Sequence, residues 1–171
     1  MYLAGIPLAT YLTKPGGVVQ SVLGSSLKLM PGGPVPNDRV IAALTALYAY
    51  WAFAGSGAFS VAAQGMGRKA GFDNNHPRAH ISDLRGLPLR LRSAHYNLIE
   101  NFPVFAIAAA LQQTINPRDQ QGLNLLALHV FLKLVVFYPS YLADLAPPRS
   151  LSHLLAMSSV IGVCWRLAVG A

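Results

Sequence analysis

Four stretches of this chain are nearly free of charged residues. The windows are 40–67, 93–117, 120–143 and 150–165. Two of them hold no Lys, Arg, Asp or Glu, and the other two hold only Glu100 and Lys133. A bilayer core needs about 20 mostly apolar residues in a helix, and the windows are near this length or longer. The pattern therefore predicts membrane-spanning segments.

These segments are predicted to be helices rather than barrel strands. Inside hydrocarbon only helices and closed barrels satisfy their backbone groups, and the four runs lack the alternation of barrel strands. We therefore expect an all-α, integral membrane, up-and-down four-helix bundle. Its predicted spans are Val40–Gly65, Leu89–Thr114, Gln120–Leu142 and Ser150–Ala168.

Composition and charge support this interpretation. The chain is 53% hydrophobic and only 11% charged, whereas a soluble domain carries about 25% charged residues. The net charge of +7 is concentrated in and beside the loop between the first two spans, which is the positive-inside pattern of membrane proteins. We expect this loop in the cytoplasm, both termini on the opposite side, and no nucleic-acid partner.

Residues 1–37 differ from the remainder, which we treat as one four-helix domain over 38–171. The first part is rich in Pro and Gly, holds two lysines and no acid, and contains an apolar stretch that is too short to span. Leu29–Pro36 is typical of a linker or turn. We expect a luminal or interfacial extension.

Several other features favour structural roles. The small residues of Ala52–Gly67 indicate close helix packing rather than a dinucleotide loop, which would need a preceding strand. His76 and His80 have helical spacing, but Pro77 lies between them and no third ligand follows, so we expect no metal site. Cys164, the only cysteine, is interpreted as a packing residue.

The second span carries an ordered polar stripe. At about 100° per residue, Arg90, Ser93, Asn97, Glu100 and Asn101 share one face. This stripe leads from the basic loop into the membrane. By the same geometry, the side chains of Arg92 and His95 are expected on the other side of the helix.

Glu100 is the residue that most needs an explanation. A carboxylate at bilayer depth costs about 2.5–3.5 kcal/mol even on an insertion scale. We therefore expect it to face another helix or another subunit, with Lys133 or Arg149 as candidate cations. Pro103 should bend or open the helix nearby and favour a binding crevice. The alternative is a buried ion pair or amide network that only holds helices in register.

The end of the third span repeats this combination of proline and polar residues. Tyr138 and Tyr141 share a face, and Arg149 follows the short turn that contains two prolines. By topology these side chains converge with Arg90 at one membrane face. An aromatic interface belt with an anchoring arginine would produce the same pattern.

Three motifs give the chain a family resemblance. They are "DNNHPRA" (Asp73 to Ala79), "RLRSAHYNLIENFPVFA" (Arg90 to Ala106) and "YPSYLADLAPPRS" (Tyr138 to Ser150). Over about residues 40 to 170 the chain resembles the MAPEG family of membrane-associated proteins in eicosanoid and glutathione metabolism, in particular its broad branch common in bacteria and fungi.

The resemblance implies a homotrimer that binds glutathione between subunits near the cytosolic face. Asn97 and Glu100 match the family's RxxxNxxE glutathione motif, Arg149 approximates the arginine thought to stabilise the thiolate, and Tyr138 and Tyr141 stand where the family places tyrosines. Two residues depart from the pattern. Ser93 stands where the motif has arginine, and Arg90 could compensate for this loss. Asn101 stands where the eicosanoid branch has a tyrosine.

The sequence therefore predicts a glutathione-dependent transferase or peroxidase. It would act on lipophilic electrophiles or lipid hydroperoxides in an endomembrane or a bacterial inner membrane. The alternative is a non-catalytic MAPEG-like protein that binds a lipid or small molecule, or serves a structural role. A channel or pump is disfavoured because one acid in four helices gives no continuous polar path.

Overall fold

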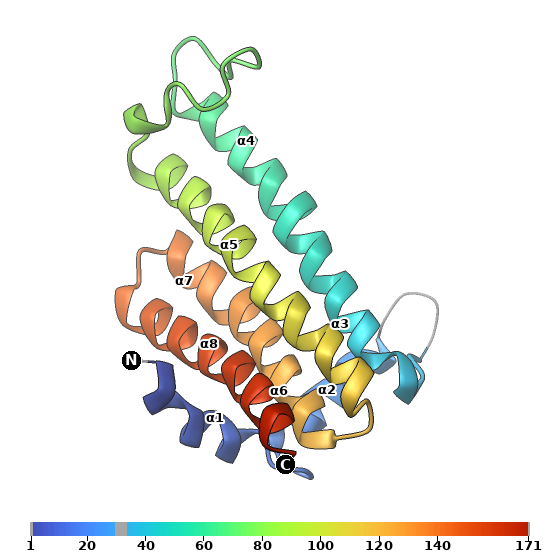
Figure 1. The fold of residues 1–171 in the computed structure, drawn as a ribbon. Helices are drawn as coiled ribbons and strands as arrows, with labels where there is room; N and C mark the ends of the chain where they lie inside the picture. Colours follow the sequence, from blue (N-terminus) through green and yellow to red (C-terminus); the bar gives the residue numbers. More distant parts are fainter. Residues whose placement is uncertain (1, 30–33, 171) are drawn as a thin grey trace.

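Four long helices form the body of the molecule (Figure 1). The computed structural model describes residues 2–29 and 34–170, which contain no strand. Four helical stretches are long and apolar enough to cross a membrane: Asn37–Met66, Gly86–Ile115, Gln120–Leu142 and Ala146–Val169. Each lies within a few residues of a predicted span. The predicted all-α four-helix membrane fold is therefore confirmed.

Two of the four stretches contain a widened π-helical turn. The first consists of η2 (Asn37–Arg39), α3 (Val40–Ala49), the π segment η3 (Tyr50–Gly55) and α4 (Ser56–Met66). The third consists of α6 (Gln120–Phe131), the π segment η5 (Leu132–Phe137) and α7 (Tyr138–Leu142). The second and fourth are the single helices α5 (Gly86–Ile115) and α8 (Ala146–Val169). A π-helical turn re-aims side chains within a helix and is often found at functional sites.

The small residues of the first span pack against α5. Ala52, Ser56, Ser60 and Ala63 recur at helical spacing and are all buried. Such side chains let two helices approach closely in a membrane. The Ser56 hydroxyl also lies 2.9 Å from His95 Nδ1. The predicted packing role is therefore confirmed.

Pro103 does not interrupt the second span. The proline lies inside α5, which continues as one α-helix to Ile115. Its ring is on the exposed side of the helix. The predicted opening of the helix at this point is therefore not observed.

The N-terminal extension is more regular than we expected. It forms η1 (Tyr2–Gly5), α1 (Ile6–Leu12) and α2 (Val18–Lys28), and α1 lies along α8 (Figure 1). The Ser158 hydroxyl donates to the Tyr2 carbonyl at 2.6 Å, and Asn124 Nδ2 donates to the Thr13 carbonyl at 3.0 Å. The extension is thus docked onto the bundle. Residues 30–33 of the predicted Leu29–Pro36 linker lie outside the described residues.

The basic loop between α4 and α5 is built from turns. Asp73 Oδ1 accepts hydrogen bonds from the backbone N–H groups of Asn75 and His76, and the bond from His76 lowers the pKa of this carboxyl. His76 and His80 each pair with a nearby aspartate. This loop and the α7–α8 turn lie toward one end of the bundle, and the α5–α6 turn lies at the other (Figure 1).

The contact between α4 and α5 gives a first prediction. Replacing fully buried Ala63 with leucine should overpack the interface, and the melting temperature in detergent should fall by the equivalent of about 1–3 kcal/mol. The matched control is Ala62→Leu on the exposed side of the same helix, which should stay within about 0.5 kcal/mol of wild type. Equal losses in the two variants would contradict this packing.

Candidate functional site

A hollow on α5 brings together part of the predicted site. It has a volume of about 340 Å³ and extends along α5 as far as Ile81 in the basic loop. Its lining consists of Ile81, Arg92, Ser93, Tyr96, Asn97, Glu100 and Tyr141. Asn97, Glu100 and Tyr141 were predicted from the sequence, and the fold places all three at one cavity.

Glu100 is exposed on the surface of the single chain. The ion pairs among the described residues involve other carboxylates. Lys133 and Arg149, the candidate cations, engage other groups. The expectation that one of them pairs with Glu100 inside the chain is therefore wrong. The expectation that Glu100 faces another subunit remains a prediction.

The amide of Asn97 is held in one orientation. Its Oδ1 accepts from Lys133 Nζ at 2.8 Å and from Asn101 Nδ2 at 3.2 Å. Asn101 Nδ2 also donates to the backbone carbonyl of Asn97 at 2.5 Å. With the oxygen engaged by protein donors, Asn97 Nδ2 is the group left for a ligand. This amide nitrogen can only donate, so it suits a carboxylate or carbonyl oxygen.

Lys133 is the centre of a buried polar network. Its side chain is fully buried, and Nζ lies 2.8 Å from His153 Nδ1 and 4.3 Å from the centre of the Phe137 ring. His153 Nε2 in turn lies 3.1 Å from the Tyr2 hydroxyl. The network therefore connects α5, η5, α8 and the N-terminal extension. Within the described part of the chain no carboxylate contacts Lys133.

Two of the predicted cations lie beside the end of α7. Arg90 Nε donates to the Leu142 carbonyl at 3.0 Å, and its guanidinium lies 3.5 Å from the carboxylate of exposed Asp144. Arg149 stacks over the Tyr141 ring at 4.7 Å. Neither arginine lines the hollow, although Arg149 stacks on Tyr141, which does.

Arg92 was expected to point away from the stripe, and this interpretation was incomplete. Its guanidinium reaches α4, where Nη1 donates to the Ser60 hydroxyl at 3.4 Å. It also lies over the Tyr96 ring at 4.2 Å and donates to the Tyr96 hydroxyl at 2.6 Å. The pair lines the hollow beside Glu100. A helical wheel misses this because a long arginine side chain extends well beyond its own facet.

The two predicted tyrosines lie in different surroundings. Tyr141 is half-buried and lines the hollow. Tyr138 is buried and packs edge-on against Trp51, with 5.5 Å between ring centres. Its hydroxyl has no hydrogen-bond partner among the described residues. The structure therefore brings Tyr141, but not Tyr138 or Arg90, to the hollow.

Fold and site together define a polytopic membrane protein with a polar hollow on its second span. The chain matches the model of the MAPEG family over residues 40–169 and belongs to that family. Members of the family are glutathione transferases, peroxidases or leukotriene synthases. No curated protein and no solved structure matches the chain.

The contact between Lys133 and Asn97 gives the second prediction. Lys133→Met, Asn97→Leu and the double variant form a cycle in which both single changes remove the same hydrogen bond. The double variant should be more stable than the summed losses imply, with a coupling free energy of about 0.5–3 kcal/mol. Thermal unfolding in detergent measures it. As a control, the stability losses of Lys133→Met and of Thr114→Val, on an exposed surface, should add. If the losses of Lys133→Met and Asn97→Leu also add, the hydrogen bond between Lys133 and Asn97 is contradicted.

Proposed function

We propose that this protein is a membrane-bound, glutathione-dependent transferase or peroxidase that acts on lipophilic electrophiles or lipid hydroperoxides. The hollow on α5 is the observation that carries this proposal. It presents an amide donor, a carboxylate and two tyrosines on the outer side of a membrane-spanning helix. Residues 38–171 would carry the activity, in an endomembrane or a bacterial inner membrane.

The lining residues fit the chemical groups of glutathione. Glutathione carries one ammonium, two carboxylates and a thiol. Glu100 would bind the ammonium, and Asn97 Nδ2 would donate to a carboxylate or carbonyl oxygen. Arg90, which lies outside the hollow beside the end of α7, would have to leave its contacts with Leu142 and Asp144 to hold a carboxylate in a charge-assisted bond. Tyr141 would flank the peptide.

Arg149 is the residue that we assign to the chemical step. A free thiol has a pKa of about 8.5, and a neighbouring cation favours the thiolate. In a conjugation, the thiolate attacks the electrophilic carbon, a C–S bond forms and the leaving group departs with its electron pair. In a peroxidase reaction, two glutathione thiols reduce one hydroperoxide to an alcohol and water and become a disulfide.

The second substrate would enter from the lipid. Beyond Glu100, α5 exposes Val104 and Ile107, so an apolar surface leads along the span to the hollow. A lipophilic compound dissolved in the bilayer can reach this surface without crossing water. Recognition by apolar contact also leaves the shape of the electrophile weakly constrained.

Glu100 also supports assembly into a homotrimer. In the single chain this carboxylate is exposed on a membrane-spanning helix. A charge at such a depth is normally turned toward protein. A second copy packed over the hollow would cover Glu100, supply a cation and complete the glutathione site between protomers.

One observation favours the alternative of a non-catalytic MAPEG protein. Ser93 stands where glutathione-using members have arginine, and the nearby guanidinium groups of Arg90, Arg92 and Arg149 engage other groups of the chain. The hollow would then hold a lipid or small molecule, or the stripe would serve assembly alone. In that case Glu100→Gln should alter oligomer stability without affecting any turnover.

Glutathione binding is the first test of the proposal. Purified protein should give binding heat with glutathione in titration calorimetry, and Glu100→Gln should weaken affinity about tenfold through loss of a charge-assisted contact. Asn97→Asp should also weaken it, because the donor nitrogen becomes an acceptor oxygen. Asp83→Asn, in the exposed loop, is the matched control. A folded trimer that shows no binding heat at millimolar glutathione would contradict the proposal.

Turnover with an aromatic electrophile tests the role of Arg149. Arg149→Ala should reduce kcat more than it raises KM and move the pH–rate profile toward higher pH, since less thiolate forms without the cation. Arg78→Ala, in the same basic end of the molecule, should leave both parameters unchanged. Turnover that survives loss of both Arg149 and Arg90 would exclude these assignments.

A further inference from the structure

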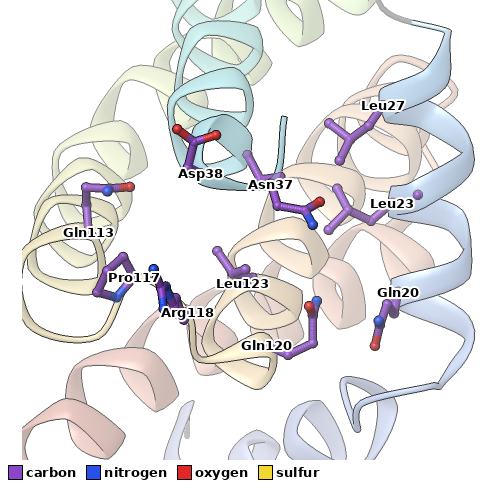
Figure 2. A pocket seen from close by; sticks show the side chains of 12 residues that line it. Gln20, Leu23, Leu27, Asn37, Asp38, Gln113, Pro117, Arg118, Gln120 and Leu123 are labelled. Carbon is purple, nitrogen blue, oxygen red and sulfur yellow. The ribbon is translucent and has the colours of Figure 1, made fainter. Parts of the chain in front are cut away.

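A larger hollow lies at the end of the bundle opposite the basic loop. It has a volume of about 720 Å³ and separates α2 from the turn that joins α5 and α6 (Figure 2). Its deep lining is apolar, with Leu23, Val40 and Leu123 all buried. Its rim is polar and includes exposed Asp38, Gln113 and Arg118. The hollow is therefore amphipathic, with an apolar floor below a charged and polar mouth.

This hollow is separate from the site proposed for glutathione. Part of its wall comes from α2 and from Asp38, which lie outside the residues matched by the family model. The other part comes from the α5–α6 turn within that match. The N-terminal extension therefore creates a site that the family bundle alone does not contain.

The surroundings of α2 place this hollow beside the bilayer. On one side of α2, Val19 and Leu23 are buried against the bundle. On the other side Val18 and Val22 are 63% and 45% exposed, and Leu29, just beyond the helix, is 84% exposed. A helix with apolar side chains on both faces suits the boundary between headgroups and acyl chains. Arg118 lies past the end of α5 at Ile115, where a span leaves the hydrocarbon.

The rim carries one charge of each sign. Within the described residues, neither the Asp38 carboxylate nor the Arg118 guanidinium forms a side-chain hydrogen bond or an ion pair. A guanidinium binds phosphate through paired N–H donors. A carboxylate accepts hydrogen bonds from a primary ammonium but not from a quaternary one, which has no N–H. The site therefore matches a headgroup with both phosphate and ammonium.

We propose that this hollow binds a zwitterionic phospholipid whose headgroup carries a phosphate and a primary ammonium. Arg118 contacts the phosphate, Asp38 contacts the ammonium, and Gln113 bonds to ester or glycerol oxygens. The acyl chains cover Leu23 and Leu123 and continue along the apolar outer face of α2. The lipid thereby joins the N-terminal extension to the α5–α6 turn.

Native mass spectrometry of the full-length protein in detergent tests this assignment. Equal concentrations of phosphatidylethanolamine, phosphatidylcholine and phosphatidylglycerol are added separately, and the fraction of protein that retains one lipid is measured. Wild type should retain phosphatidylethanolamine about tenfold more tightly than the other two lipids. Because the three lipids are compared on the wild-type protein, this experiment tests the proposal even if a variant fails to fold.

Two variants assign the contacts. Asp38→Asn should remove the preference for phosphatidylethanolamine over phosphatidylcholine, and Arg118→Gln should weaken retention of both. Asp83→Asn and Arg78→Gln make the same charge changes in the opposite loop and should change nothing. Equal retention of the three lipids by wild type, or an unchanged preference in Asp38→Asn, would overturn the proposal. So would a protein that retains no lipid because a second copy occupies the hollow.

Discussion

A buried lysine sets the arrangement of the membrane-embedded part of this protein. The Lys133 side chain is fully enclosed, and its described partners are an asparagine, a histidine and a phenylalanine ring rather than a carboxylate. A basic group at this depth is tolerated only where neighbouring helices supply acceptors. Asn97 on α5 and His153 on α8 provide them, so three of the four spans are held in register around one amine.

This arrangement determines what the hollow offers to a ligand. Because Lys133 engages the oxygen of Asn97, the amide nitrogen is the group of this side chain that is left to donate to a ligand. Because Lys133 is enclosed behind α5, it does not neutralise Glu100, which stays on the surface of the chain. The polar stripe thus has an inner side that holds the helices together and an exposed residue, Glu100, that we propose for glutathione or a neighbouring copy. Asn97 belongs to both sides of the stripe, because its oxygen joins the buried network and its nitrogen is the group that we propose for a ligand.

The fold could be predicted from the sequence because its main constraint, the length of each apolar segment, can be read along the chain. Charge-free windows of bilayer length are visible without knowledge of neighbours, and the small residues of the first span indicate a close contact. The placement of Asn97 and Glu100 on one face followed from helical geometry. The partner of each side chain did not, because a helical wheel gives directions within one helix and says nothing of which helix covers it. For this reason helical geometry left both Lys133 and Arg149 as candidate partners of Glu100 and did not show that the Arg92 side chain reaches the hollow.

The helices of the N-terminal extension could not be predicted from the sequence for a different reason. Its prolines and glycines are typical of loops, but its helices are stabilised by hydrogen bonds to α8 and α6 that span more than a hundred residues of sequence. Such tertiary contacts override local propensity. The extension also places Tyr2 against His153, at the edge of the Lys133 network.

The proposed site requires a second copy of the chain to shield Glu100 from lipid, and one measurement tests this directly. A spin label at Glu100→Cys, in a Cys164→Ser background and a lipid bilayer, reports both collisions with dissolved oxygen and dipolar contact with labels on other copies. We expect low oxygen accessibility together with dipolar broadening between neighbouring labels. Oxygen accessibility typical of acyl chains, with no dipolar broadening, would contradict the account.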